Sequence, residues 1–257
     1  MNALSAAPAL SLHERLQTDA LVGPFSKTCD PNLVEAIGRS GMDFIILDLE
    51  HGPNDIVNLG NLIRAAELSG LAAVVRTLRL DQIGRALDLG ATAVQIPHVS
   101  TSEDARAAVR TARFSPDGQR GVCRYVRAAA HGTTEKQRYF REANRVTLIA
   151  QVEGKAGLTD LPEIIAVPGI DVVFLGVYDL SQSLGIVGQT DHPDVIAALT
   201  QVIAQCRQRR IPVGTFVESV ETARRYRALG VNYLCYSVDV GLIGDACRHV
   251  ATQVKAT

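Results

Sequence analysis

Short apolar runs alternate with longer amphipathic stretches along most of the chain. Residues 44–47 (FIIL) form a short β-rich apolar run, which is typical of a fully buried parallel strand. Gly52 and Pro53 then break the pattern. Residues 54–69 place apolar side chains at helical spacing, and Gly70 ends that stretch. The pattern therefore predicts a strand, a turn and a helix in succession.

The same unit recurs and predicts eight strands alternating with helices. The predicted strands are 21–26, 44–52 including its polar end, 72–75, 93–96, 146–152, 171–175, 212–215 and 233–238. The predicted helices are 32–41, 54–69, 80–89, 102–112, 136–143, one that reaches 166, 192–209, 219–229 and 242–254. Eight such units in one chain of this length predict a (β/α)8 TIM barrel rather than an open doubly wound sheet. The first strand is not followed by a GxGxxG pattern, which further disfavours a dinucleotide-binding fold.

Composition agrees with one barrel domain over residues 1–257, in which residues 1–20 form a loose N-terminal arm. The chain is 47% hydrophobic with a formal net charge of -1, and its charges are scattered, so we expect no nucleic-acid partner. No apolar run approaches the roughly 20 residues that span a bilayer, so we expect no membrane partner. The N-terminus lacks a basic region ahead of its apolar stretch, which disfavours a signal peptide and predicts a cytoplasmic protein.

Five cysteines without CxxC spacing indicate neither a disulfide framework nor a zinc site. Cys206, Cys235 and Cys247 lie in apolar or helical patterns and are expected in the core. Cys29 and Cys123 fall in predicted loops, but neither has an adjacent histidine. A nucleophilic cysteine is therefore disfavoured.

Polar residues stand at the carboxyl ends of the predicted strands, where barrels of this kind carry their active sites. They are His51, Arg76, Glu153 and Asp179. Neighbouring parallel strands lie about 4.8 Å apart, so Glu153 and Asp179 should bring two carboxylates together. Two such anions need a proton or a cation between them, and a divalent ion such as magnesium or manganese would serve. A salt-bridge network with Arg76 or Lys155 is the alternative.

His51 follows two acids, Asp48 and Glu50, at the end of the strand that precedes it. A nearby anion orients an imidazole and supports its charged form, which is typical of a proton-transfer site. The alternative is that His51 is only a neighbour of a helix N-terminus and is satisfied by Asp48.

Eight motifs resemble one enzyme family and cover nearly everything after Leu21. They are ILDLEHGPN (46–54), VVR (74–76), ALDLGATAVQIPHV (86–99), RFSPDGQRGV (113–122), QVEGKAGL (151–158), LGVYDLSQSLG (175–185), HPDV (192–195) and GTFVES (214–219). In this order they resemble the HpcH/HpaI family of metal-dependent, class II pyruvate aldolases. The resemblance implies a (β/α)8 barrel that reversibly cleaves a 4-hydroxy-2-oxo acid to pyruvate, or a close analogue, and an aldehyde.

The resemblance also implies a role for each matching residue. Glu153 and Asp179 would bind the divalent metal, which in the family is magnesium, manganese or cobalt. Arg76 would bind the pyruvyl oxygen, and His51 supported by Asp48 would form the acid/base dyad.

Further positions would complete the site. Gln151, Gly176 and Val177 would bind pyruvate, and Glu50 would stand behind the metal ligands. Members of the family often assemble as trimers or dimers of trimers that exchange the last helix, so a homo-oligomer, either a trimer or a hexamer, is predicted.

The chain departs from the family pattern at three places. The family commonly has Gly-Pro-x-Asp-Leu-Ser, whereas this chain has Gly-Val-Tyr-Asp-Leu-Ser at 176–181, which introduces Tyr178. Cys123 replaces a frequent glycine, and His98 occupies a position that is commonly apolar. These residues are expected on the substrate side.

Other functions remain open on the sequence. A Schiff-base aldolase would need a desolvated lysine, for which Lys27 is the main candidate. A decarboxylase or a CoA-thioester lyase would share the enolate chemistry, and a non-catalytic barrel could retain metal and 2-oxo acid binding.

Three arginines, Arg120, Arg124 and Arg127, lie in the long segment that we place after the fourth strand on the active face. Guanidinium groups suit carboxylates, so we expect Arg124 or Arg127 to contact an acidic substrate tail. A CoA-binding groove, a subunit contact or a solvent-exposed position are the alternatives.

Overall fold

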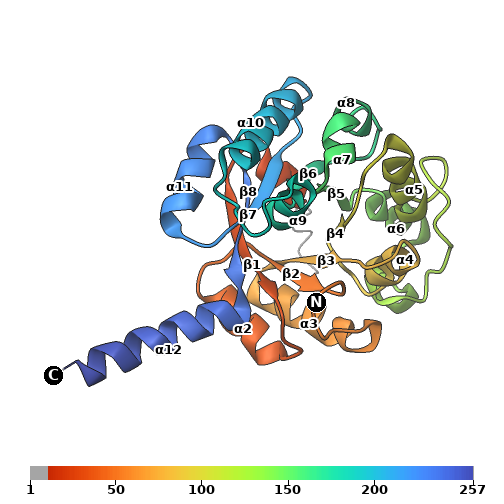
Figure 1. Cartoon of the computed structure of the whole chain (residues 1–257). Helices are drawn as coiled ribbons and strands as arrows, with labels where there is room; N and C mark the ends of the chain where they lie inside the picture. Colours follow the sequence, from red (N-terminus) through yellow and green to blue (C-terminus); the bar gives the residue numbers. More distant parts are fainter. Residues whose placement is uncertain (1–10, 257) are drawn as a thin grey trace.

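The computed structural model describes residues 11–256, and its eight strands form a closed barrel in sequence order (Figure 1). The strands are β1 (Leu21–Ser26), β2 (Phe44–Asp48), β3 (Ala72–Arg76), β4 (Ala93–Ile96), β5 (Thr147–Val152), β6 (Val172–Leu175), β7 (Val213–Val217) and β8 (Tyr233–Val238). All neighbours are parallel, and β8 pairs with β1 to close the ring. The predicted (β/α)8 barrel is thus confirmed.

Helices surround the barrel and connect its strands. They are α2 (Pro31–Arg39), α3 (Ile56–Ser69), α4 (Asp81–Asp88), α5 (Ser102–Ala112), α6 (Lys136–Ala143), α7 (Lys155–Thr159), α8 (Leu161–Ile164), α9 (Val177–Leu184), α10 (Pro193–Gln208), α11 (Val220–Leu229) and α12 (Asp239–Lys255). In the described part of the chain, no helix is both long and apolar enough to cross a membrane.

Side chains alternate between two cores along each strand. In β2, Phe44 and Ile46 point into the barrel, whereas Ile45 and Leu47 pack outward against the helices. All four are fully buried, which explains why this strand reads as a continuous apolar run. Inside the barrel, the rings of Phe44 and Tyr233 lie 4.4 Å apart. The interior is therefore packed, and polar chemistry is confined to the ends of the barrel.

A short helix, α1 (Leu12–Leu16), closes the amino-terminal end of the barrel. Leu12 and Leu16 lie one turn apart and are both buried in the interior cluster. Ser11 and Glu14 form a capping box at the start of this helix. Residues 11–20, which we expected in a loose arm, are thus ordered by this contact, and residues 1–10 lie outside the described residues.

The long segment after α5 lies at the same end of the barrel as α1. It contains the 3-10 helix η1 (Arg127–Gly132) and α6, and it leads into the start of β5. We expected it on the active face, directly after the fourth strand, and this was wrong. Because α5 has already returned the chain to the amino-terminal end, the segment cannot reach the opposite end.

The cysteines follow the prediction with one exception. Cys206 and Cys235 are buried, and Cys29 and Cys123 are exposed. Cys247 is exposed on α12 rather than packed in the core. This helix projects from the barrel, so its apolar pattern does not indicate burial within the chain (Figure 1).

Candidate active site

Asp48 and Arg76 face each other at the carboxyl ends of β2 and β3. The two residues are partners in the strand register. Arg76 donates through Nε to Asp48 Oδ1 at 2.8 Å and through Nη2 to Oδ2 at 2.6 Å, a bidentate arrangement. Burial favours a raised pKa for the Asp48 carboxyl, but the hydrogen bonds and charges of Arg76 and Lys27 outweigh it and lower the pKa to about 2. Asp48 is therefore a fixed anion that aims Arg76.

Asp48 also holds the turn that follows β2 and the lysine that follows β1. The backbone N–H groups of Glu50 and His51 donate to Oδ1 at 3.0 and 3.3 Å. Lys27 donates its ammonium to Oδ2. Gly52 is required in this turn because a Cβ there would collide with the carbonyl oxygen of Asp48. Five donors thus converge on one fully buried carboxylate.

The predicted contact between the Asp48 carboxylate and the His51 imidazole is not found. Across residues 11–256, no hydrogen bond joins the two groups, and the His51 side chain is exposed on the active face. The physical reason is that Arg76, Lys27 and two backbone groups already occupy the carboxylate. His51 therefore lies at the site without the support that we expected.

Lys27 is already engaged, and this bears on the Schiff-base alternative. Its ammonium donates to the buried Asp48 and lies 5.7 Å from the centre of the Phe25 ring. Attack on a carbonyl needs a neutral amine with a free lone pair. In this geometry the Lys27 nitrogen is held against the Asp48 carboxylate rather than free to attack a carbonyl, which disfavours an imine mechanism.

Glu50 and His98 connect this half of the site to the other half. The side chain of Glu50 is buried, with Oε2 3.1 Å from Arg76 Nη1 and Oε1 2.9 Å from His98 Nε2. The Oε2 contact is an ion pair without good hydrogen-bond alignment, so Oε2 remains unsatisfied. His98 Nδ1 lies 2.8 Å from Glu153 Oε1, and the His98 backbone N–H donates to the same oxygen at 2.7 Å. His98 thereby bridges two carboxylates.

Glu153 directly follows β5, and its environment raises the pKa of its carboxyl. Burial raises the pKa of the Glu153 carboxyl, and the negative charge of Asp179 raises it further, whereas Gln151 and His98 act in the opposite direction. Gln151 donates its side-chain amide to Glu153 Oε2 and accepts from Gln95. The charge of Asp179 therefore acts on Glu153 in the direction expected of two neighbouring carboxylates.

The backbone of Gly176 packs directly against Glu153. A Cβ on Gly176 would lie 2.6 Å from Glu153 Oε2, so only glycine fits at this position. Val177 is buried and begins α9, whose first turn carries the exposed Asp179. The close approach of β6 to Glu153 therefore brings the N-terminus of α9 to the site, where its free N–H groups favour an anionic group.

These contacts fit a divalent cation between Glu153 and Asp179. The raised pKa of Glu153 indicates a carboxylate whose negative charge is poorly compensated, and Glu50 Oε2 accepts no hydrogen bond although it lies near Arg76. Among the described residues, no three His, Cys, Asp or Glu side chains form a metal-binding group. The protein would therefore supply two carboxylates and leave the other positions to substrate and water, which suits a hard ion. The alternative salt bridges with Arg76 or Lys155 are not among the ion pairs of residues 11–256.

A tyrosine and a glutamate stand at the rim of the same face. Tyr178 donates its hydroxyl to Glu218 Oε2 at 2.7 Å, and its ring lies 5.9 Å from that of Phe216 in β7. Burial and the neighbouring Glu218 raise the pKa of Tyr178 to about 12. Sequence reasoning noted Tyr178 but missed Glu218, although Glu218 directly follows β7 and could have been found among the strand-end residues.

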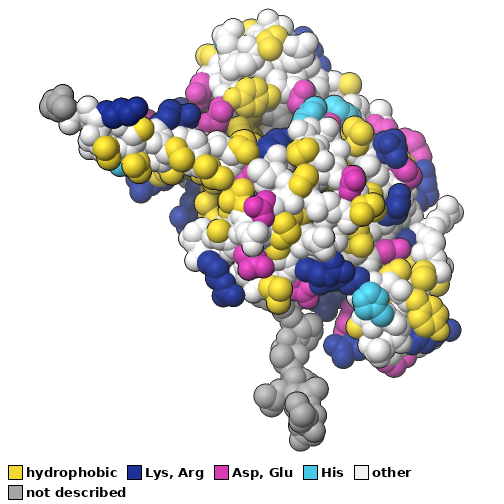
Figure 2. All heavy atoms as spheres, turned by 90° about the horizontal axis from the view of Figure 1, so that it is seen from below, with side chains coloured by type: hydrophobic (Ala, Val, Ile, Leu, Met, Phe, Trp, Pro, Cys, Tyr) yellow, Lys and Arg dark blue, Asp and Glu magenta, His cyan; other side chains and the backbone are white. Residues whose placement is uncertain are grey.

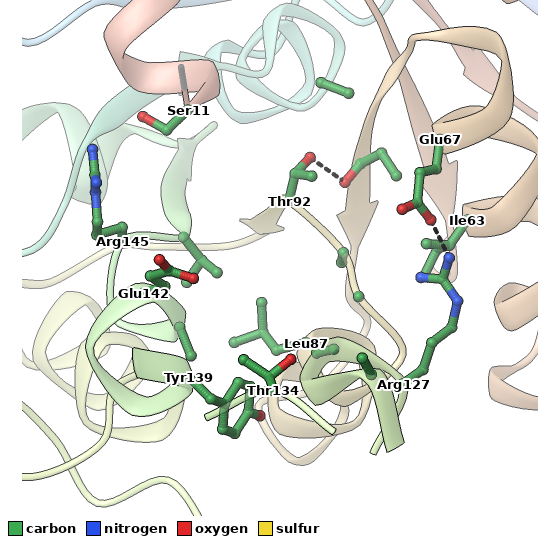
Figure 3. A pocket seen from close by; sticks show the side chains of 18 of the residues that line it. Ser11, Ile63, Glu67, Leu87, Thr92, Arg127, Thr134, Tyr139, Glu142 and Arg145 are labelled. Carbon is green, nitrogen blue, oxygen red and sulfur yellow. Dashed lines mark hydrogen bonds and ion pairs between the residues drawn. The ribbon is translucent and has the colours of Figure 1, made fainter. Parts of the chain in front are cut away.

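The arginines of the long segment lie at the other end of the barrel. Arg127 donates to the Leu89 carbonyl at 3.0 Å and pairs with Glu67 (Figure 3). Leu89 and Glu67 belong to the ends of helices that lead into β4 and β3. Arg124 donates to the Gly132 carbonyl within its own segment. The prediction that Arg124 or Arg127 contacts a substrate tail at this chain's active site is therefore wrong.

Arg120 is likewise engaged away from the active face. It donates to Asp88 Oδ1 at 2.6 Å, and its guanidinium stacks over Phe114 at 4.6 Å. The basic cluster that suggested a CoA-binding groove is thus dispersed into separate structural contacts. This removes the feature that favoured a CoA-thioester lyase.

The fold and the site together define a class of enzyme. A parallel barrel that places an arginine, a histidine and two converging carboxylates at the carboxyl ends of its strands can bind a 2-oxo acid and stabilise an enolate. Carbon–carbon lyases are enzymes of this class.

Residues 21–246 match the family described as HpcH/HpaI aldolase/citrate lyase, and the chain belongs to this family. It is therefore an aldolase-type enzyme with a (β/α)8 barrel.

Named relatives cover nearly the whole chain. It is 33% identical to 2-dehydro-3,6-dideoxy-6-sulfogluconate aldolase of Pseudomonas putida, over 92% of this chain and 93% of the relative. It is 31% identical to hydroxypyruvate/pyruvate aldolase of Paraburkholderia phytofirmans, over 93% of this chain and 95% of the relative. A crystal structure of a family protein from Burkholderia cenocepacia superposes with a TM-score of 0.90 and 36% identity, covering 95% and 99% of the two chains.

Proposed function

We propose that the protein cleaves the C3–C4 bond of a 4-hydroxy-2-oxo acid to give pyruvate, or a close analogue, and an aldehyde. The observation that carries this proposal is the aimed Arg76 at the end of the barrel that also holds Glu153 and Asp179. The reaction needs positive charge where the enolate forms. Arg76 is itself a cation, and the carboxylates of Glu153 and Asp179 would hold a second one.

Arg76 would bind the 2-oxo oxygen of the substrate. Asp48 holds its Nε and Nη2, so the remaining Nη1 is directed toward Glu50 and the open side of the site. Its charge would stabilise the oxyanion as C3–C4 cleavage proceeds. Gln151 and the backbone at Gly176 and Val177 would orient the substrate carboxylate.

Glu153 and Asp179 would hold a divalent metal, with magnesium, manganese and cobalt as the candidates. Such an ion, when bound, supplies Lewis-acid stabilisation of negative charge on the oxygens of the 2-oxo acid. Glu50 would keep Glu153 in position through His98, which contacts both carboxylates. Gln151 would do the same through the hydrogen bond that its amide donates to Glu153.

His51 would act as the base. As the C3–C4 bond breaks, His51 takes the proton of the C4 hydroxyl, the aldehyde forms, and the bonding electrons pass to the enolate. Protonation at C3 then gives pyruvate. Asp48 cannot be this base, because it is fully buried, filled by five donors and has a pKa near 2.

Replacing His51 by alanine tests this assignment. Removal of a positioned acid/base group typically lowers a rate by roughly 100-fold or more. We expect a loss of about 100-fold in the release of pyruvate, with a smaller effect on pyruvate binding. The matched control is His131→Ala, because His131 is exposed in η1 on the opposite end. A His51→Ala enzyme that cleaves substrate at the wild-type rate would assign the base to another group.

We also propose that α12 binds a second copy of the chain, as part of a homo-oligomer. The helix leaves the barrel (Figure 1), and hydrophobic side chains run along one side of it (Figure 2). Ile243, Val250 and Val254 are 45%, 59% and 78% exposed, and with Cys247 they follow helical spacing on one face. An apolar stripe of this kind is stable in water when another surface covers it.

Light scattering of the full chain tests the role of α12. We expect wild-type protein to be oligomeric, and Val250→Glu or Val254→Glu to shift it to smaller species, because a charge in a buried apolar contact is costly. The control is His249→Glu, at a neighbouring polar position of the same helix. An unchanged mass in both valine variants would show that α12 forms no subunit contact.

A further inference from the structure

The rim of the active face carries a pair of side chains that the proposed mechanism does not use. Tyr178 is 43% exposed and donates its hydroxyl to Glu218 Oε2 at 2.7 Å. The two residues follow β6 and β7, so they stand at the same end of the barrel as Glu153. Tyr178 also directly precedes Asp179, which places the pair next to the reacting end of the site.

Aromatic contacts connect this pair to Arg76. The guanidinium of Arg76 lies 4.7 Å from the centre of the Phe25 ring. Phe25 lies 6.0 Å from Phe216, and Phe216 lies 5.9 Å from Tyr178. These rings form a continuous row from Arg76 to the rim, in which Phe25 is buried in the interior cluster and Tyr178 is exposed. A substrate held by Arg76 would extend its other end toward Tyr178.

Glu218 gives the rim a negative charge that is not neutralised. It is exposed, and it takes part in none of the ion pairs formed among residues 11–256. Its hydrogen bond from Tyr178 uses one oxygen and leaves further lone pairs free. A carboxylate can accept a hydrogen bond from a hydroxyl group, whereas it repels another anion.

We propose that Tyr178 and Glu218 form the subsite for the aldehyde end of the substrate and select a neutral, hydroxyl-bearing aldehyde over an anionic one. This inference rests on the proposed aldolase function. A hydroxyl of the aldehyde donates to Glu218, and the phenol oxygen of Tyr178 accepts from a second hydroxyl. The arginines at the opposite end of the barrel offer this chain's own site no cation for an acidic tail.

Two acceptor aldehydes of equal length test the inference. Glyceraldehyde and tartronate semialdehyde differ in carrying a CH2OH group or a carboxylate at the far carbon. We expect the wild-type enzyme to add pyruvate to glyceraldehyde with the higher kcat/KM. Glu218→Gln should reduce this preference about tenfold, because it removes the repulsion of the anionic aldehyde. Tyr178→Phe should lower kcat/KM for glyceraldehyde more than for tartronate semialdehyde.

Control measurements separate this inference from the proposed function. Glu221→Gln removes the same charge from an exposed position in the first turn of α11 and should leave the preference unchanged. Exchange of the C3 protons of pyruvate in D2O is measured for every variant, since it reports enolate formation without any aldehyde.

Suppose that the wild type exchanges the C3 protons of pyruvate. If Glu218→Gln and Glu221→Gln then change the preference between the two aldehydes equally, or if neither changes it, the subsite alone is overturned. Absence of exchange in metal-loaded wild type would overturn the proposed function, and the subsite with it.

Discussion

Glu153→Gln should lower aldol cleavage by about 100- to 1000-fold and abolish the binding of Mn²⁺ measured by calorimetry. Glutamine keeps the size of the side chain and its hydrogen bond from the His98 backbone, but it removes the negative charge. Loss of a single group that stabilises transition-state charge commonly costs this much. Because Glu153 and Asp179 are the two carboxylates that converge at the site, the remaining one should not hold the ion alone.

The control for this variant is Glu163→Gln, which removes an exposed charge from α8. It should bind Mn²⁺ as the wild type does. Circular dichroism should show that Glu153→Gln is folded, since Glu153 lies at a strand end and not in either core. Wild-type activity in this variant, or in enzyme treated with EDTA, would exclude the proposed metal site.

The fold could be predicted from the sequence because its signals are local. The apolar run at 44–47 and the helical spacing at 54–69 each depend on residues within one element, and the same alternation repeats along the chain. The direction of the strands alone was enough to predict which end of the barrel carries the site. Glu153 and Asp179 were assigned to the same end in this way, and the charge of Asp179 raises the pKa of Glu153.

Contacts between distant residues could not be predicted in the same way. Nothing in the sequence near Asp48 shows that Lys27 and Arg76 occupy its carboxylate, which leaves none of it for the His51 imidazole. Arg127 was assigned to the active face because its segment was taken to follow the fourth strand directly. The intervening helix α5 reverses the direction of the chain, and this reversal decides the position of the segment.

Asp48 connects the stability of the barrel to its chemistry. It is the anion shared by Arg76 and Lys27, and it also accepts from the turn that carries His51. Its pKa is lowered to about 2 in the folded protein from 3.8 in the unfolded chain. A lowered pKa stabilises the fold at a pH above the unfolded value. The contribution of roughly 2 kcal/mol should therefore be lost as the pH falls from about 4 to about 2.

Asp48→Asn should lower the free energy of unfolding by about 3 to 5 kcal/mol, because buried Arg76 loses its bidentate anionic partner and keeps only the ion pair with Glu50. Urea denaturation at neutral pH measures this loss. Asp43→Asn is the control, since Asp43 pairs with Arg15 at a partly exposed position and should cost about 1 kcal/mol or less. The Asp48→Asn variant should also lack the loss of stability that Asp48 causes in the wild type as the pH falls from about 4 to about 2. A denaturation midpoint equal to that of the wild type would mean that Asp48 does not anchor Arg76, and the assignment of Arg76 as the aimed cation of the site would fail with it.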